Sequence, residues 1–256
     1  MPERIMFAIQ KGGVGKTSST VAVAEVLAAS GYKVLVVDLD PQGNATRMLT
    51  QNSIYQYTGN TIMEAVQEGN AEPYIVNVKD GLDLIPAEDH LATFSRHIYT
   101  ARINKPHEVI KRLLEPIERR YDYVMIDVSP TLGDTVVNAI VYVDRIYIPL
   151  DIGDFAMDAM IRFTEFIDEA REQGHTSAVI DGILLTMRDG RGTKYERDVA
   201  EGVRQAYGNL VFQTEIHRRV RIKEMSSKGI DVLSDAMSDY MALTEEIIER
   251  VKGEKS

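Results

Sequence analysis

A glycine-rich segment near the start of the sequence carries the residues whose chemistry is easiest to assign. Between an apolar run and a stretch of helical periodicity, the chain reads Gln10-Lys11-Gly12-Gly13-Val14-Gly15-Lys16-Thr17. Such a strand-to-helix turn directs backbone N–H groups at an anion, the helix dipole adds about half a positive charge, and glycines let the backbone approach closely. We therefore predict a phosphate-binding loop, in which Lys16 contacts the β- and γ-phosphates of a nucleotide and the Thr17 hydroxyl binds Mg²⁺ directly.

The loop departs at one position from the general pattern GxxxxGK[ST], which places a glycine where this chain has Gln10. It also carries a second lysine, Lys11, at its start. Because Lys11 and Lys16 leave the turn from opposite ends, Lys11 does not easily reach the same phosphates from within its own loop. The residues expected to bind the nucleotide are Lys11, Gly12, Gly13, Val14, Gly15, Lys16, Thr17 and Ser18.

Two aspartates lie at the ends of apolar runs that are typical of buried parallel strands. Asp40 ends the run 33–40 (KVLVVDLD), and Asp127 lies near the end of 123–128 (YVMIDV). Doubly wound sheets bind ligands at the carboxyl ends of their strands, so both carboxylates are expected beside the phosphate loop, each holding a water of the metal ion. Asp38 stays open: it is either a buried carboxylate bonded to loop amides or a direct participant.

Short β-branched runs alternate with longer segments of helical period along the chain, which favours βαβ units and a parallel sheet. Strands are predicted at 5–9, 33–40, 82–86, 123–128, 145–150, 179–186 and 210–216. Helices are predicted at 16–30, 61–68, 106–120, 157–173, 196–207 and 234–252. We expect an α/β fold with a doubly wound, mostly parallel sheet and helices on both faces, as in phosphate-loop NTPases.

Composition limits the classes of function. The 256 residues, 44% of them hydrophobic, suffice for a large core, and we expect one domain over 1–256 with a loose tail at 252–256. The absence of cysteine excludes disulfides, thiolate metal sites and thiol nucleophiles. A formal net charge of −10 argues against coating nucleic acid with the whole surface, but it is compatible with a local basic patch. No run approaches the roughly 18 to 20 apolar residues of a membrane span, and we find no secretory signal, so a cytoplasmic protein is expected.

The two most specific motifs resemble those of the ParA/MinD superfamily. The loop matches its deviant Walker A motif, KGGxGK[ST], and residues 40–46 match its switch I segment, DPQGNAT. Over essentially the whole chain, the sequence is similar to short, Soj-like ParA partition ATPases. The resemblance implies Mg²⁺-dependent hydrolysis of ATP, with Asp40 as the hydrolytic carboxylate and Lys16 and Lys11 as catalytic, charge-stabilising residues. It also implies that Lys11 reaches across a two-fold axis to the partner's nucleotide, so that ATP drives formation of a homodimer.

By the same resemblance, the ATP-bound dimer binds DNA without sequence preference and is nucleoid-associated, and a ParB-like or centromere-binding adaptor stimulates the hydrolysis that releases it. Contacts to DNA phosphates need only positive charge and position, and two groups of basic residues meet that need. They are Arg188, Arg191, Lys194 and Arg197, and Arg218, Arg219, Arg221, Lys223 and Lys228. The alternative interpretation of these residues is a solvated charged face.

Two other functions could use the same nucleotide switch. One is an ATPase that positions a protein cargo instead of DNA, which nothing in the sequence separates from partition. The other is a membrane-associated regulator of the MinD type, which needs a basic amphipathic C-terminal helix. Residues 240–251 are amphipathic, but anionic lipid would repel their largely acidic polar face, so no membrane partner is expected.

Overall fold

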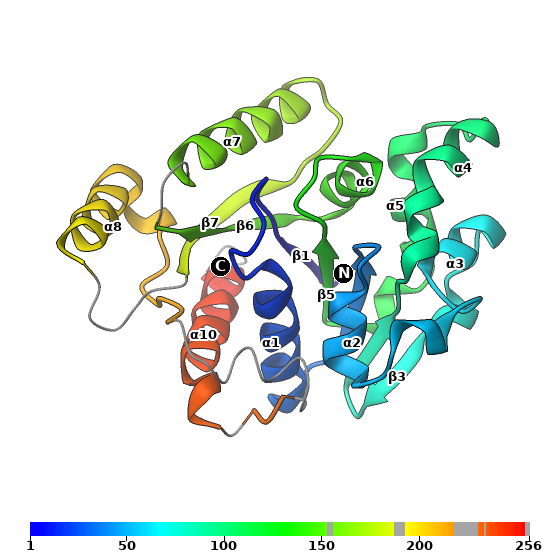
Figure 1. The fold of residues 1–256 in the computed structure, drawn as a ribbon, viewed down its shortest axis with the longest axis horizontal. Coiled ribbons are helices and arrows are strands. Elements are labelled where there is room, and N and C mark those ends of the chain that lie inside the picture. The colour runs from blue at the N-terminus through cyan, green and yellow to red at the C-terminus, as the bar shows by residue number, and fades with distance from the viewer. Residues whose placement is uncertain (153–155, 187–192, 218–229, 233, 254–256) are drawn as a thin grey trace.

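One sheet organises the protein, whose computed structural model describes residues 1–152, 156–186, 193–217, 230–232 and 234–253. The strands of this described part form a seven-stranded sheet in the order β3-β4-β2-β5-β1-β6-β7 (Figure 1). All neighbours run parallel except β3 and β4, which are antiparallel. The strands are β1 (Glu3–Phe7), β2 (Val34–Leu39), β3 (Val76–Lys79), β4 (Leu82–Ile85), β5 (Tyr123–Val128), β6 (Arg145–Asp151) and β7 (Val179–Thr186).

Helices cover both faces of the sheet. Successive side chains of a strand point to opposite faces, so strands that are apolar at nearly every position must be covered on both. Ile5 and Val34 pack into one helical layer, and Met6 and Leu35 pack into the other. The first layer holds α1 (Lys16–Ala29), α2 (Asn44–Thr50) and α10 (Ser238–Gly253). The second holds α3 (Ile62–Glu68), α4 (Phe94–Thr100), α5 (Val109–Leu114), α6 (Asp134–Tyr142), α7 (Ala156–Glu172) and α8 (Lys194–Tyr207). The predicted fold class is therefore confirmed (Figure 1).

The order of the strands brings three loops to one place. β1 lies between β5 and β6, and β5 lies beside β2, with all of these pairs parallel. Their carboxyl ends therefore share one edge of the sheet, where the connections leave in opposite directions: β1 leads to β2 on one side, and β5 leads to β6 on the other. This is the topological switch point at which doubly wound sheets bind ligands. The loops that follow β1, β2 and β5 meet there.

The segment 106–120 does not form the single helix that its periodicity predicts. It contains α5 flanked by short 3₁₀ turns at Pro106–Glu108 and Glu118–Arg120. Pro116 explains the interruption, because it has no backbone N–H and its ring clashes with the carbonyl one turn earlier. A helix therefore cannot continue through it.

The predicted strand 210–216 is also wrong. Val211 makes an isolated parallel bridge with Ile183, and the N–H groups of Gln213 and Thr214 donate to the Glu246 carboxylate instead of a strand. The apolar side chains that suggested a strand serve packing, since Phe212 is fully buried.

The sequence reasoning missed β3, a short antiparallel strand at the edge of the sheet. At the other end of the chain, α10 continues to Gly253, so the first two residues of the predicted tail at 252–256 are helical. Residues 254–256 lie outside the described part. Among the described residues, no helix combines the length and apolar character that crossing a membrane requires.

Candidate functional site

The phosphate loop follows β1 and leads directly into α1. Gly13 and Gly15 have φ angles of 75° and 91°, in the left-handed region that a side chain would strain. The helical ladder begins at Gly15, whose carbonyl accepts from the Ser19 N–H at 2.8 Å. The N–H groups at the start of α1 therefore have no acceptor within the helix and are available to an anion in the loop.

A cavity of about 720 Å³ opens at this loop, a size suited to a small-molecule ligand. The predicted nucleotide-binding residues that line it are Gly12, Gly13, Gly15, Lys16, Thr17 and Ser18. Asp40 lines it from the end of β2. Val14 is buried behind the loop, and Lys11 is partly exposed; neither lines the cavity.

Lys16 is turned into the loop rather than toward solvent. Its side chain is buried, and its Nζ donates to the Lys11 carbonyl at 2.7 Å. Burial lowers the pKa of Lys16, while the nearby Asp127 and Asp40 carboxylates oppose that shift. An ammonium has three N–H donors, so two remain for phosphate oxygens beyond the bond to Lys11.

Asp127 is a fully buried carboxylate that lacks a hydrogen-bond partner among the described residues. Neither of its oxygens accepts a hydrogen bond within the described part of the chain. Burial raises the pKa of Asp127 well above its ordinary value, and the Asp38 carboxylate, its partner in the β2–β5 register, raises it further. The proximity of the Thr17 hydroxyl and of Lys16 opposes that rise, although the hydroxyl does not reach hydrogen-bonding geometry. A cation, or a donor from a ligand, can satisfy such a group.

Asp38 has the opposite environment. Its carboxylate accepts from the Asp40 N–H at 3.1 Å, the Thr46 N–H at 2.9 Å and the Thr46 hydroxyl at 2.8 Å. Burial raises its pKa to about 6, and these hydrogen bonds act against the rise. Of the two interpretations left open by the sequence, the structure favours a buried carboxylate bonded to loop amides.

Asp40 is held near the cavity by a tightly packed turn. Its Oδ1 accepts from the Gln42 N–H at 3.0 Å, which orders the start of the segment 40–46. Gly43 follows with a φ of 58°, and a Cβ there would lie 2.6 Å from Cγ2 of Ile54 and 2.7 Å from the Ala87 carbonyl oxygen. The glycine of DPQGNAT is therefore required by both backbone conformation and space.

These residues fit a nucleotide with Mg²⁺. Mg²⁺ is commonly bound through one or two carboxylates together with substrate phosphates, instead of by a cage of protein ligands. No cluster of three or more His, Cys, Asp or Glu side chains that could hold a metal occurs among the described residues. Thr17 and Asp40 line the cavity, and the unpaired Asp127 lies beside Thr17, so oxygen donors are present at the place where the sequence predicts the ion.

Comparison with known proteins establishes the family. The AAA domain family matches residues 3–180. Chromosome partitioning protein ParA from Caulobacter vibrioides is 34% identical over 261 residues, which cover 97% of this chain and 95% of the relative. Sporulation initiation inhibitor protein Soj from Bacillus subtilis is 31% identical over 258 residues, covering 93% and 95%. The chain belongs to the ParA/Soj family.

A solved structure supports the cofactor expectation for this ParA/Soj family member. Cobyrinic acid a,c-diamide synthase from Mycobacterium smegmatis, with bound ADP and magnesium, is 25% identical and superposes with a TM-score of 0.85 over 99% of this chain and 97% of that one. Its ligands agree with the predicted cofactors, ATP and Mg²⁺. Its name also shows that one fold hosts different reactions, so the reaction must be argued from the site.

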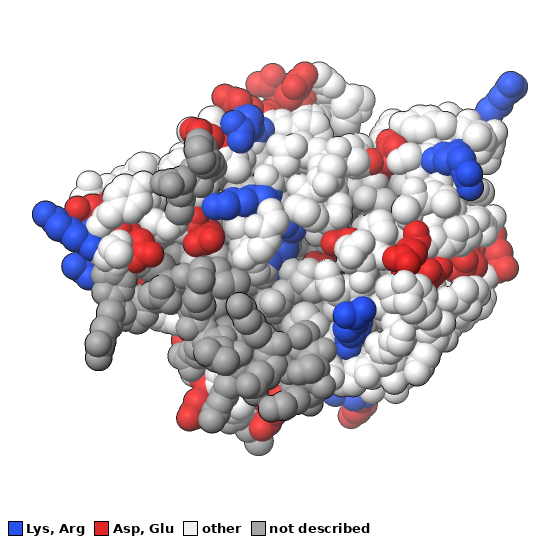
Figure 2. All heavy atoms as spheres, viewed as in Figure 1, with Lys and Arg blue, Asp and Glu red and all other residues white. Residues whose placement is uncertain are grey.

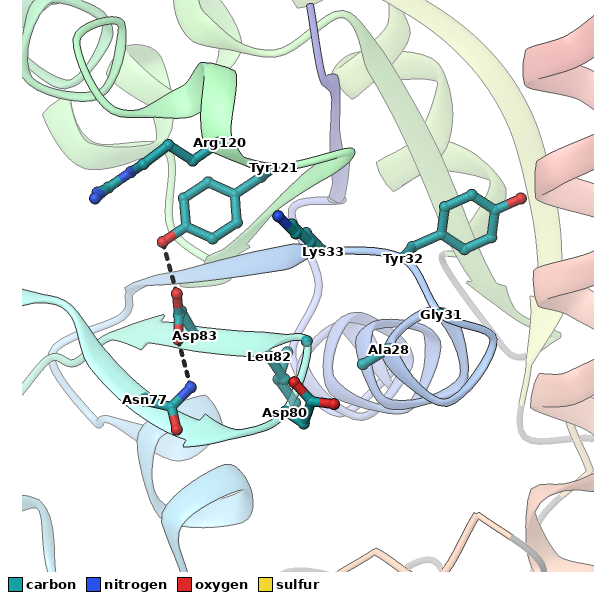
Figure 3. Close-up of a pocket in the computed structure, with 11 residues that line it drawn as sticks. Ala28, Gly31, Tyr32, Lys33, Asn77, Asp80, Leu82, Asp83, Arg120 and Tyr121 are labelled. Atoms are coloured by element: carbon teal, nitrogen blue, oxygen red, sulfur yellow. Dashed lines mark hydrogen bonds between the residues drawn. The ribbon is translucent and has the colours of Figure 1, made fainter.

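A second cavity in the ParA/Soj family member, of about 400 Å³, lies away from the phosphate loop (Figure 3). It opens beside the first residues of β2 and β4, at the opposite edge of the sheet. Asp83 accepts there from the Tyr121 hydroxyl at 2.8 Å and from the Asn77 amide at 2.9 Å. Because this cavity lies at the edge of the sheet opposite the phosphate loop, we assign it no part in nucleotide binding.

Only two of the predicted DNA-binding residues lie in the part of the chain that the structure describes. Lys194 and Arg197 are exposed on the first turn of α8. On the face drawn in Figure 2, Lys and Arg side chains lie scattered among Asp and Glu. Arg188, Arg191, Arg218, Arg219, Arg221, Lys223 and Lys228 lie outside the described residues.

Sequence reasoning missed the roles of two buried threonines that lie next to the site. The Thr46 hydroxyl donates to Asp38 and accepts from the Ala87 N–H at 3.0 Å. The Thr186 hydroxyl, at the end of β7, donates to the Val14 carbonyl at 2.9 Å. Thr46 lies within the DPQGNAT match, which marked its segment but not its role. For Thr186, its place at the end of a predicted strand does not indicate this bond.

Proposed function

We propose that this protein is an ATP-dependent partition ATPase. ATP with Mg²⁺ favours a homodimer that binds DNA without sequence preference. Hydrolysis, stimulated by a ParB-like or centromere-binding adaptor, releases the DNA. The observation that carries the proposal is the different placement of two lysines in one loop: Lys16 is buried against the Lys11 carbonyl, whereas the Lys11 side chain is partly exposed. The family relationship to a chromosome partitioning protein supports the biological role.

Within one subunit, the chain's own residues divide the work of hydrolysis. Lys16 and the N–H groups at the start of α1 bind the phosphates, and Thr17 binds the metal ion. Asp40, which lines the same cavity, orients the attacking water, and Asp127 holds a water of the metal ion. Bound Mg²⁺ supplies positive charge that stabilises the transferring phosphoryl group.

The placement of the Lys11 side chain favours a dimer. We find no hydrogen bond or ion pair of its side chain within the described part of the chain, and it does not line its own subunit's cavity. A charge that has no partner among the described residues of its own subunit can contact the nucleotide of a second subunit across a two-fold axis. ATP then favours the dimer because both subunits contact it, and loss of the γ-phosphate reverses the preference.

DNA binding and cellular location follow from the dimer. Two subunits double the number of basic groups offered to DNA, including the exposed Lys194 and Arg197 of α8. Contacts to phosphates are independent of sequence and weaken as salt rises. The protein is then cytoplasmic in its ADP state and nucleoid-associated in its ATP state.

The decisive experiment measures binding to a non-specific DNA duplex by fluorescence anisotropy. Wild-type protein, Lys11→Ala and a control, Lys33→Ala, are compared with ADP and with ATP and Mg²⁺, over about 50 to 200 mM salt. Lys33 is exposed beside the second cavity, at the opposite edge of the sheet, and its substitution removes the same charge. Both variants therefore change the net charge of the protein by the same amount.

We expect binding by wild type and Lys33→Ala only with ATP, decreasing steeply with salt, and its loss in Lys11→Ala. Absence of DNA binding in every nucleotide state would refute the partition function. Equal loss in the two variants would refute the special role of Lys11, since it would indicate an effect of net charge alone.

A further inference from the structure

The phosphate loop is held from outside by the end of β7. Thr186, the last residue of β7, is 1% exposed, and its hydroxyl donates to the carbonyl of Val14, which is equally buried. β7 is not a neighbour of β1, because β6 lies between them. The bond therefore ties the loop to a strand two places away in the sheet, across a sequence separation of 172 residues.

The position of this bond matters because it controls the peptide unit between Val14 and Gly15. The flanking residues Gly13 and Gly15 both have left-handed φ angles, and glycine gives a peptide unit more freedom to rotate than any other residue. In a trans peptide, the carbonyl and the following N–H point in opposite directions. A hydrogen bond from Thr186 to the Val14 carbonyl thus directs the Gly15 N–H away from β7.

The Gly15 N–H belongs to the site itself. Gly15 lines the phosphate-loop cavity, and its carbonyl begins the hydrogen-bond ladder of α1. The Lys11 carbonyl, at the other end of the loop, is held from inside by the Lys16 ammonium. Lys16 is also expected to contact phosphates, whereas Thr186 is buried and does not line the cavity.

We propose that Thr186 is a positioning residue of the phosphate loop: by holding the Val14 carbonyl, it presents the Gly15 N–H to the phosphates of the nucleotide. This role rests on the nucleotide-binding function proposed above. Thr186 touches no substrate itself, and its effect passes through one peptide unit. A hydroxyl that only satisfied a buried carbonyl would contribute to stability but not to nucleotide affinity.

The test replaces two buried threonines by valine, one at the phosphate loop and one far from it in sequence, and compares nucleotide affinity and stability. Thr186→Val removes the donor with little change of volume, and Thr186→Ser keeps it. Thr244→Val is the matched control, because Thr244 is also 1% exposed and its hydroxyl donates to a backbone carbonyl, that of Tyr240, at 2.7 Å within α10. For each protein, isothermal titration calorimetry measures the affinity for ADP and for AMPPNP with Mg²⁺, and urea denaturation measures stability.

We expect Thr186→Val to weaken binding of both nucleotides about tenfold, as the loss of one well-placed hydrogen bond predicts. Thr186→Ser should stay within about threefold of wild type, and Thr244→Val within about twofold. Nucleotide affinity of Thr186→Val equal to that of wild type, with a loss of stability like that of Thr244→Val, would overturn the inference.

Two further outcomes are distinguishable. If wild-type protein binds neither nucleotide, the proposed function fails and this inference fails with it. If wild type binds but Thr186→Val does not fold by circular dichroism, Thr186→Cys replaces it, because a thiol fills similar space but donates weakly. The same criterion then applies: unchanged affinity overturns the positioning role, and an affinity about tenfold weaker supports it.

Discussion

Substitution of Thr46 by valine removes one hydroxyl from a buried junction while nearly keeping the side-chain volume. That hydroxyl donates to the Asp38 carboxylate at 2.8 Å and accepts from the Ala87 N–H at 3.0 Å. Thr46, Asp38 and Ala87 are all fully buried, so water cannot replace the lost partner. The change therefore tests whether this junction stabilises the protein.

The magnitude follows from the two bonds. Losing a hydrogen bond to a charged acceptor costs about 1.5–3 kcal/mol, and leaving the buried Ala87 N–H unpaired costs about 1–3 kcal/mol. Asp38 keeps two backbone donors, the N–H groups of Asp40 and Thr46, so the low part of the first range applies. We expect the free energy of unfolding to fall by about 3 kcal/mol. With a urea m-value of about 3 kcal/mol/M, the unfolding midpoint should fall by about 1 M.

The assay is urea denaturation of nucleotide-free protein, followed by circular dichroism. Thr46→Ser should recover most of the loss because it keeps the hydroxyl. Thr244→Val, in which one hydroxyl bond inside α10 is removed, should cost less than about 1 kcal/mol. A Thr46→Val protein whose midpoint lies within about 0.2 M of wild type would refute the reasoning.

Two further predictions concern the neighbouring residues. The pKa of Asp127 is higher in the folded protein than in the unfolded chain. The folded protein therefore loses stability relative to the unfolded chain as the pH rises toward the pKa that Asp127 has in the folded state. The unfolding free energy of Asp127→Asn minus that of ligand-free wild type should therefore increase between about pH 4 and pH 8 in urea titrations, and a difference independent of pH would contradict it. Gly43→Ala should destabilise by about 3 kcal/mol, from left-handed backbone strain plus contact with Ile54 and the Ala87 carbonyl. Gly59→Ala, at a φ of 80° with open space around it, should show the backbone strain of about 1–2 kcal/mol alone, and equal losses in the two variants would show that the contact is unimportant.

The elements that depend on residues adjacent in the chain could be predicted from the sequence. The phosphate loop is one contiguous segment whose glycines, lysines and following helix are adjacent in the chain. β2 and β5 could be predicted because a strand covered on both faces is apolar at nearly every position, and both are buried throughout. Two segments were predicted wrongly because their local pattern is weak or misleading. The four residues of β3 are mostly half-buried and carry little pattern, and 210–216 is apolar for packing without forming a strand.

The tertiary structure decided what depends on residues far apart in the chain. Asp38 and Asp127 have similar sequence settings, each near the end of an apolar run, and they become partners only through the register of β2 and β5. Their environments then differ because Thr46 and the Asp40 N–H donate to Asp38, while no donor among the described residues makes a hydrogen bond to Asp127. Thr186 meets Val14 only because the strand order carries the end of β7 to the phosphate loop. Sequence thus determined which groups this protein has for phosphate chemistry, and the packing of its strands decided which of them are paired, because hydrogen bonds depend on proximity in space.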